Sequence, residues 1–287
     1  MVTPFKRRHA CKPHQLHHPR IGQITRDPLL LPHVQNPTLL LASIHSSAPV
    51  NALRGFWHRL TRPNLQPAPA WPADRKPLLL KISDYGIPKP CRLLHIGANG
   101  GQEASYYEAH AIQAWHVEAI PELFQTLKAH CQQFKHQTPI LACISDEPGK
   151  EVVFHVASNS GLSSSLLGLG RHAVANPSIT YVRSINLASA TIDSLIESGV
   201  LPSEIDFLVL DVQGAELLAL KGAQGLLASG SLRGALIETS VHPLYEGGST
   251  YLDVSALLQR HGLYMCEAIF NKNGWCDVIY GRQYWPS

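Results

Sequence analysis

The chain has 287 residues, 45% of them apolar and 16% charged, so a real core is possible for most of its length. No run of 18 apolar residues is present, and no membrane-spanning helix is expected. The net charge of +3 at pH 7 hides an asymmetry, because residues 1–80 carry 11 Lys and Arg against 2 Asp and Glu, whereas the other 207 residues carry 13 against 19.

Residues 1–78 are predicted to be a basic, His- and Pro-rich, poorly ordered leader, and residues 79–287 the folded domain. The first 80 residues hold 12 of the 21 prolines and 7 of the 16 histidines, a composition that favours an extended, solvated chain. An organelle transit peptide remains an alternative, because such leaders are also Arg-rich and acid-poor. Nucleic-acid binding is not expected, since the basic residues are spread out and histidine is mostly neutral at pH 7.

The six cysteines contain no C-x-x-C pair, which argues against a zinc site and against a disulfide framework. Reduced thiols fit a cytoplasmic location, and no secretory signal is evident. We therefore predict a cytoplasmic protein without a metal site.

From about residue 90, strand and helix patterns alternate. In chain order we expect a strand at 92–97, a helix at 102–112, a strand at 114–120, a helix at 121–134 and a strand at 139–145. Strands at 150–158 and 179–188 suggest a hairpin-like insertion, before a helix at 191–198. The remainder reads as a strand at 206–212, a helix at 215–229, a strand at 234–240, a helix at 252–262 and strands at 264–270 and 276–282. This order predicts an α/β fold with a doubly wound, Rossmann-like, mostly parallel sheet and an antiparallel C-terminal edge strand.

The turn between the first strand and the first helix, "GANGG", lies where open α/β sheets bind ligands. Glycine lets the backbone approach a ligand closely, and a helix start offers N–H groups and a positive dipole end. Gly97, Asn99 and Gly100 are therefore candidate binding residues. The turn is neither G-x-G-x-x-G nor a P-loop, so alone it is also compatible with a tight turn that holds nothing.

Two acids follow the next two strands. Glu118 ends the second strand, where a carboxylate can accept hydrogen bonds from a ribose diol. Asp146 follows the third strand, where an acid can accept from an adenine amino group or simply form a turn before Pro148. A glycine turn and two such acids describe an adenosine site without a pyrophosphate grip, and S-adenosylmethionine fits that description.

The region from about residue 91 to residue 282 resembles the FkbM-type methyltransferases, a class I S-adenosylmethionine-dependent family. The resemblance rests on "HIGANGGQE", "VEAIPELFQTL", "CISDEPGKEVVF", "SGLSSSLL", "TIDSLI", "IDFLVLDVQGAELLALKGA" and "ALIETSVH". Three positions depart from the family pattern. His95 stands where members usually have an acid, Gln213 replaces the Glu of Asp-x-Glu-Gly, and Val209 stands where a Lys is frequent.

Asp211 is the best candidate for a catalytic base, because it ends the strongly apolar fourth core strand and faces the predicted cleft. Glu238 and His242 lie near the next strand end and are further catalytic candidates, although each also reads as a structural acid or a loop histidine. Glu216 is interpreted mainly as a helix-start acid favoured by the helix dipole. The segment "SGLSSSLL" is either a ligand loop that supplies hydroxyls or a polar turn.

The resemblance implies transfer of a methyl group to a hydroxyl of a sugar, glycan or small secondary metabolite. Two alternatives remain open. One is a catalytically silent α/β nucleotide-binding module, an alternative supported by the departures from the family pattern at His95 and Gln213. The other is a nicotinamide-dependent oxidoreductase, against which the missing third glycine of the turn argues.

Overall fold

The computed structural model describes residues 76–271 and 273–282, so the predicted leader lies almost wholly outside the described residues. The described chain begins with helix α2 (Lys76–Lys81), which continues into the 3-10 turn η2 (Ile82–Tyr85). Leu79 of α2 and Ile82 of η2 are buried against the sheet. The predicted boundary at 78/79 therefore falls inside a packed helix, and the domain division stays a prediction.

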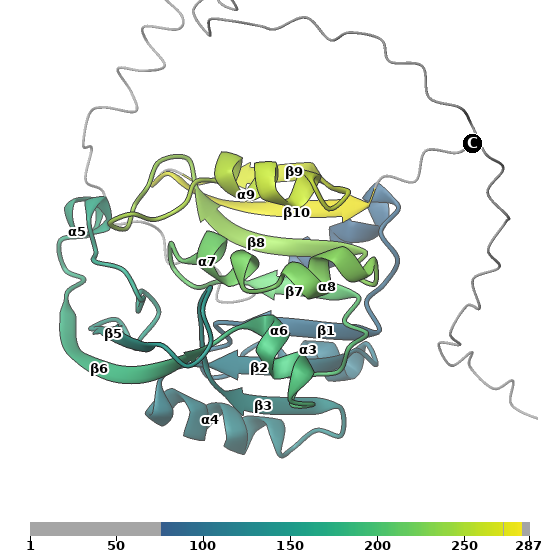
Figure 1. Cartoon of the computed structure of the whole chain (residues 1–287), viewed down its shortest axis with the longest axis horizontal. Helices are drawn as coiled ribbons and strands as arrows, with labels where there is room; N and C mark the ends of the chain where they lie inside the picture. Colours follow the sequence, from purple (N-terminus) through teal and green to yellow (C-terminus); the bar gives the residue numbers. More distant parts are fainter. Residues whose placement is uncertain (1–75, 272, 283–287) are drawn as a thin grey trace, which may run out of the picture. The chain divides into compact units, whose positions relative to one another are not determined.

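Seven strands form the main sheet, in the order β3-β2-β1-β7-β8-β10-β9 (Figure 1). Their bounds are β1 (Arg92–Ile96), β2 (Gln113–Glu118), β3 (Gln137–Leu141), β7 (Phe207–Leu210), β8 (Gly234–Ser240), β9 (Leu263–Phe270) and β10 (Trp275–Arg282). The pairs from β3 to β8 are parallel, and β10 is antiparallel to both β8 and β9. The predicted mostly parallel sheet with an antiparallel C-terminal strand is confirmed. The antiparallel strand is β10, one place inside the edge that β9 forms.

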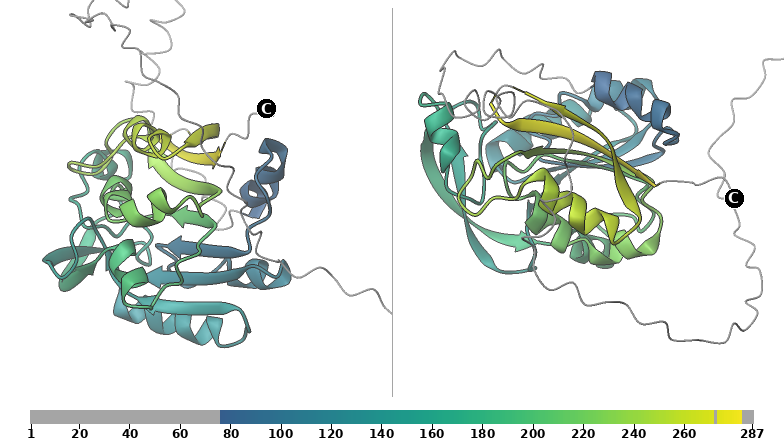
Figure 2. Two further views of the ribbon diagram at one scale, coloured as in Figure 1. Left: turned by 45° about the vertical axis from the view of Figure 1, so that its right-hand side comes forward. Right: turned by 90° about the horizontal axis from the view of Figure 1, so that it is seen from above.

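Helices cover both faces of this sheet, as the view from above in Figure 2 shows. One face packs against α6 (Ile192–Glu197), α7 (Glu216–Lys221), α8 (Gln224–Ser229) and α9 (Tyr251–Gln259). The other face packs against α2 and α3 (Ala104–Ala109), while α4 (Pro121–Cys131) lies against β2 and β3. The sheet is therefore doubly wound.

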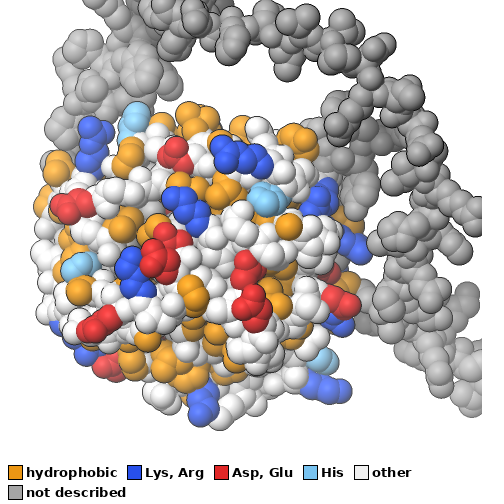
Figure 3. Space-filling model, viewed as in Figure 1, with side chains coloured by type: hydrophobic (Ala, Val, Ile, Leu, Met, Phe, Trp, Pro, Cys, Tyr) orange, Lys and Arg blue, Asp and Glu red, His pale blue; other side chains and the backbone are white. Residues whose placement is uncertain are grey.

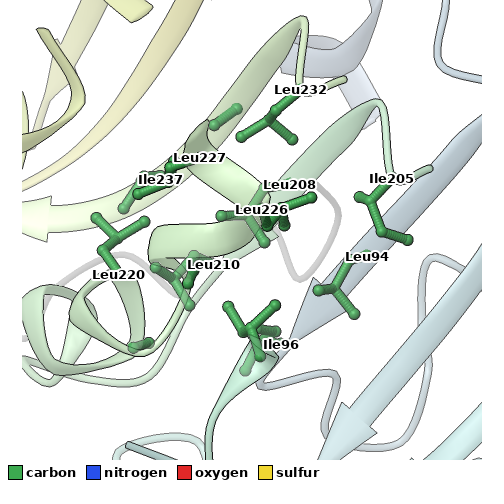
Figure 4. Close-up of a cluster of buried hydrophobic side chains, with 14 of the residues drawn as sticks. Leu94, Ile96, Ile205, Leu208, Leu210, Leu220, Leu226, Leu227, Leu232 and Ile237 are labelled. Carbon is green, nitrogen blue, oxygen red and sulfur yellow. The ribbon is translucent and has the colours of Figure 1, made fainter. Parts of the chain in front are cut away.

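Alternation along the central strands assigns each side chain to one face. Leu94, Ile96, Leu208 and Leu210 point to the face of α6–α9 and join Leu220, Leu226 and Leu227 in the largest buried cluster (Figure 4). Leu93, Phe207 and Val209 point to the opposite face, toward α2 and α3. The near-continuous apolar runs of these strands follow from burial on both faces.

Two predicted elements are split in the structure. The strand expected at 139–145 becomes β3 and a two-residue strand, β4 (Cys143–Ile144), which pairs with the insertion instead of the main sheet. The helix expected at 215–229 becomes α7 and α8. Asp193 of α6 accepts hydrogen bonds from the N–H groups of Gly225 and Leu226, at 2.7 and 3.0 Å, and so starts α8 as a separate helix.

The predicted hairpin-like insertion is confirmed as β5 (Glu151–Ala157) paired antiparallel with β6 (Tyr181–Ala190). A loop and the short helix α5 (Arg171–Ala175) connect the two strands. The guanidinium of Arg183 on β6 lies 2.6 Å from the Glu122 carboxylate on α4. Asn99 also donates to the carbonyl of Ser160, at 3.3 Å, so the insertion is tied to the main sheet beside the glycine turn.

The surface and the thiols bear on the remaining expectations. No helix among the described residues is long and apolar enough to cross a membrane. On the face in Figure 3, Lys and Arg side chains are interspersed with Asp and Glu. Among the described residues, Cys131, Cys143, Cys266 and Cys276 are free thiols. A cytoplasmic location stays a prediction.

Candidate functional site

A cavity of about 80 Å³ opens at the carboxyl ends of β1, β2 and β7. The strand order reverses here, because β2 and β3 lie on one side of β1 and β7 and β8 on the other. The glycine turn, β4, the insertion and the turn after β7 complete its wall. The lining residues are Ile96, Gly97, Asn99, Val117, Glu118, Ala119, Ile120, Ala142, Cys143, Ile144, Phe154, Gly161, Leu162, Ser164, Leu166, Asp211, Val212, Gln213 and Ala215.

The turn after β1 requires glycine at its first position. Gly97 has a φ of +81°, and a Cβ built there would lie 1.8 Å from the backbone oxygen of Asp211. The ends of β1 and β7 therefore meet without any intervening side chain. Asn99 also has a positive φ, of +48°, a conformation that asparagine tolerates better than most residues.

All five N–H groups of this turn are already hydrogen-bonded within the protein. Gly97 and Ala98 donate to the carbonyl of Val117, both at 3.0 Å, and Gly101 donates to the carbonyl of Ala98 at 2.8 Å. Asn99 donates to the Glu118 carboxylate at 2.9 Å, and Gly100 donates to Oδ1 of Asn99 at 2.7 Å. The N–H groups that a phosphate would need are thus engaged before any ligand arrives.

Glu118 lines the cavity with 6% of its surface exposed. One carboxylate oxygen accepts from Asn99 and the other accepts from the N–H of Ile120 at 2.8 Å. Burial raises the pKa of this carboxyl, and the charge of Asp211 adds to the rise, while the backbone hydrogen bonds oppose it. A carboxylate accepts more than one hydrogen bond per oxygen, so Glu118 retains capacity toward the cavity.

Asp146 follows β4 but is not among the lining residues. Its Oδ1 accepts from the Ser145 hydroxyl at 3.1 Å. The side chains that β4 brings to the cavity are those of Cys143 and Ile144. The role of Asp146 toward an adenine amino group stays a prediction.

The structure brings Asp211 and Glu238 together through Gln213. The amide nitrogen Nε2 of Gln213 lies 2.6 Å from Oδ1 of Asp211 and 2.6 Å from Oε2 of Glu238. Its Oε1 accepts from the hydroxyl of Tyr245 at 2.9 Å. Asp211 is half-buried and lines the cavity, whereas Glu238 is buried and does not line it. The amide of Gln213 links the two carboxylates.

The other two candidate acid-base residues lie elsewhere. His242 is half-buried in the loop after β8 and does not line the cavity. Glu216 is fully buried at the first position of α7 and accepts from the N–H of Gly214 at 2.9 Å. This geometry agrees with the interpretation of Glu216 as a helix-start acid, and burial raises its pKa to about 7.

The segment 160–167, "SGLSSSLL", closes one side of the cavity through Gly161, Leu162, Ser164 and Leu166. Its other serines face the protein. Ser165 donates to the backbone carbonyl of Gln213 at 2.8 Å, and the hydroxyl of Ser163 lies 2.9 Å from Nε2 of the buried His172. Some residues of the segment therefore line the cavity and others anchor the loop, and its role toward a ligand stays a prediction.

Sequence reasoning did not identify Tyr245 and did not predict the orientation of His95. Tyr245 is 1% exposed and fixes Gln213, but no local pattern marks it, because the loop that carries it reaches the site only in the folded protein. His95, in the position where the family usually has an acid, faces α3 instead of the cavity. Its Nδ1 lies 3.3 Å from the Tyr107 hydroxyl, which makes it part of a buried polar contact behind β1.

Three comparisons relate this chain to known proteins. A search of curated proteins finds no match. The solved structures with similar folds include a TehB-like S-adenosylmethionine-dependent methyltransferase from Corynebacterium glutamicum, with 15% identity, a TM-score of 0.38 and coverage of 81% of this chain and 97% of that one. Magnesium protoporphyrin IX methyltransferase from Synechocystis, with bound S-adenosylhomocysteine, has 9% identity, a TM-score of 0.41 and coverage of 72% and 81%. Fibrillarin from Aeropyrum pernix, with bound S-adenosylmethionine, has 14% identity, a TM-score of 0.37 and coverage of 66% and 65%.

The family comparison covers the site itself. The model described as methyltransferase FkbM domain matches residues 95–263, which is more than half of the chain. The match runs from the last residues of β1 to the start of β9 and includes the glycine turn, Glu118, the insertion and the Asp211–Gln213–Glu238 group. The chain therefore belongs to the FkbM methyltransferase family.

Proposed function

We propose that the protein is an S-adenosylmethionine-dependent methyltransferase that methylates a hydroxyl group of a sugar, a glycan or a small secondary metabolite. The observation that carries the proposal is the chemistry of the cavity wall. Its charged groups are Glu118 and Asp211, and none of the described lining residues is Lys, Arg or His. Together with the engaged N–H groups of the glycine turn, this wall favours a cationic, hydroxyl-bearing ligand and disfavours a dinucleotide pyrophosphate.

The lining residues fit S-adenosylmethionine in three respects. Glu118 offers carboxylate oxygens for the two ribose hydroxyls, and Gly97 and Asn99 of the turn border the amino-acid end. Gly100 does not line the cavity, and its contact with the cofactor stays a prediction. Apolar side chains, those of Ile120 and Ile144 among them, suit the faces of an adenine ring. Asp146 remains the proposed partner of the adenine amino group. The negative wall complements a sulfonium ion and an ammonium group.

The cofactor supplies a methyl group on a positively charged sulfur, and the acceptor oxygen takes it up in a single displacement. The task of the protein is to place the acceptor hydroxyl and to receive its proton. We assign both roles to Asp211, which lines the cavity at the end of β7. Glu238 stands behind Asp211, and His242 is a candidate for receiving the proton only if the loop after β8 moves.

The acceptor is proposed to enter beside segment 160–167. Leu162 is 55% exposed and also lines the cavity, so it lies at the rim. The carboxylates of the wall disfavour phosphorylated or carboxylated acceptor groups near the methyl group. Neutral hydroxyl compounds are not repelled by these carboxylates and need no cationic side chain to balance their charge.

Cofactor binding is tested by titration calorimetry with S-adenosylhomocysteine and, in parallel, with NAD. Binding of S-adenosylhomocysteine together with no binding of NAD supports the proposal. Binding of NAD alone would instead favour the oxidoreductase alternative. Incubation with S-adenosylmethionine labelled in its methyl group and a cell extract then tests transfer, and the labelled product identifies the acceptor.

Asp211→Asn tests the assigned base. Asparagine keeps an oxygen for the hydrogen bond from Gln213 but is a poor base, so transfer should fall by roughly 10²-fold or more while affinity for S-adenosylhomocysteine is kept. The exposed Asp84→Asn is a matched control that should leave transfer unchanged. Transfer near the parent rate in Asp211→Asn would exclude Asp211 as the base.

A further inference from the structure

The side chain of Gln213 connects the candidate base to the buried interior. Its Nε2 contacts Asp211 and Glu238, both at 2.6 Å, and its Oε1 accepts from Tyr245. An amide nitrogen carries two hydrogens, so each carboxylate receives one of them. The opposite orientation of the amide would aim its oxygen at two carboxylates and its nitrogen at a hydroxyl, which makes the observed orientation the favoured one.

The backbone of Gln213 is held as firmly as its side chain. Its φ is +55°, and its carbonyl accepts from the Ser165 hydroxyl at 2.8 Å. Tyr245 is itself buried, and its hydroxyl also lies 3.1 Å from the carbonyl of Ser163. Contacts from the residue after β7, from β8, from segment 160–167 and from the loop after β8 therefore converge on this one residue.

The surroundings of Asp211 are rich in acids. Its negative charge adds to the effect of burial in raising the pKa of Glu118 at the end of β2, of Glu216 on α7 and of Tyr245. Glu238 on β8 lies opposite the buried Asp277 on β10 in the register of these two strands. Carboxylates that lie close together repel one another unless hydrogen-bond donors lie between them.

We propose that Gln213 is a positioning residue. Its amide donates one hydrogen bond to Asp211 and one to Glu238, orients both carboxylates, and so keeps Asp211 ionised and able to receive a proton. The inference rests on the proposed function for its catalytic meaning. It also gives a reason for the departure from Asp-x-Glu-Gly, because a glutamate at this position has at most one hydrogen to donate to two carboxylates. The neutral amide supplies two donors at every pH.

A carboxyl-carbon NMR titration of Asp211 tests the inference without any acceptor. In Gln213→Met, which has a similar length but no donor, the titration midpoint of the Asp211 carboxyl carbon should move to higher pH than in the parent. If the methionine variant does not fold, Gln213→Glu carries the same expectation. An unchanged midpoint in a folded variant would overturn the inference.

The pH profile of methyl transfer provides a second readout. With labelled S-adenosylmethionine and a fixed cell extract, the acid limb of the profile should move to higher pH in Gln213→Glu and stay in place in the matched surface variant Gln224→Glu. A uniform loss of transfer at all pH values, without any displacement of the limb, would make Gln213 merely structural and overturn the proposal.

The double variant Gln213→Glu/Glu238→Gln separates stability from positioning. It restores the number of carboxylates, so thermal stability should recover relative to Gln213→Glu, but the acid limb should stay displaced because the amide of Gln213 is still missing. Recovery of the parent profile would contradict the inference. A parent protein that transfers no methyl group, yet shows the shifted NMR midpoint in its variants, would refute the proposed function and support the positioning geometry.

Discussion

Replacing Gly97 by alanine should disrupt both the fold and the cavity. A Cβ at this position would lie 1.8 Å from the backbone oxygen of Asp211, whereas ordinary contacts begin at 3.4 Å, so β1 and β7 would have to separate by about 1.6 Å. The obstacle is backbone, which cannot rotate away as a side chain can. Asp211 would be displaced from the cavity wall with the end of β7.

The loss of folding stability expected in Gly97→Ala has two parts, which a control variant can separate. The positive φ of +81° alone costs an alanine roughly 1–2 kcal/mol. Separation of the strands also weakens the hydrogen bond from Asp211 N to the carbonyl of Ile96, and each such bond contributes about 0.5–1.5 kcal/mol. With lost packing at the strand ends, we expect a total of about 4 kcal/mol or more, a large share of a typical stability of about 5–15 kcal/mol.

The matched control is Gly149→Ala. Gly149 has a φ of +74° and nothing within 4 Å of a built Cβ, so this variant carries the conformational cost without the clash. Urea unfolding followed by circular dichroism measures both variants, and titration with S-adenosylhomocysteine measures binding. Equal stability losses, or cofactor affinity retained in Gly97→Ala, would refute the close approach of the two strand ends.

Three further outcomes are expected. Glu118→Ala should weaken S-adenosylhomocysteine binding by roughly 1.5–3 kcal/mol in calorimetry, the range for hydrogen bonds to a charged group, and unchanged affinity would sink the ribose assignment. The pKa of Glu216 is about 7 in the folded protein and 4.5 in the unfolded chain, so the folded state binds more protons between these pH values. The free energy of unfolding should therefore fall by up to about 3 kcal/mol as the pH rises from 4.5 to 7. Glu216→Gln should flatten that fall in urea titrations at several pH values. A chain starting at Leu65 should keep its melting temperature and cofactor binding, whereas one starting at Ile82 should melt lower, because it loses the buried Leu79; equal melting would contradict the packing of α2.

Much of the fold could be predicted because its signals are local. The apolar runs of β1, β7 and β8 mark strands buried on both faces, and the acids that follow β2 and β7 were expected at one end of the sheet. The structure places Glu118 and Asp211 in one cavity, as that reasoning required. Glu118 and Asp211 could be placed together because the carboxyl ends of neighbouring parallel strands lie at one edge of the sheet, whereas Asp146 follows β4, which pairs with the insertion.

The features that could not be predicted depend on contacts distant in the sequence. The link from Gln213 to Glu238 and Tyr245 joins positions 25 and 32 residues away, and no periodicity encodes it. The break between α7 and α8 depends on Asp193, which lies on another helix. The bonding of the glycine turn also could not be predicted, because its composition does not reveal that the Val117 carbonyl and the Glu118 carboxylate accept from Gly97, Ala98 and Asn99.

The internal bonding of the glycine turn also determines how a ligand meets the protein. Val117 and Glu118 accept hydrogen bonds from residues 97–99, and Gly100 and Gly101 donate within the turn, so the turn is already hydrogen-bonded before a ligand arrives. Binding therefore loses little conformational entropy at this wall, and encounter should proceed without a slow folding step. In the free protein the amide hydrogens of the turn should exchange slowly with solvent, and saturation with ligand should change their exchange only slightly.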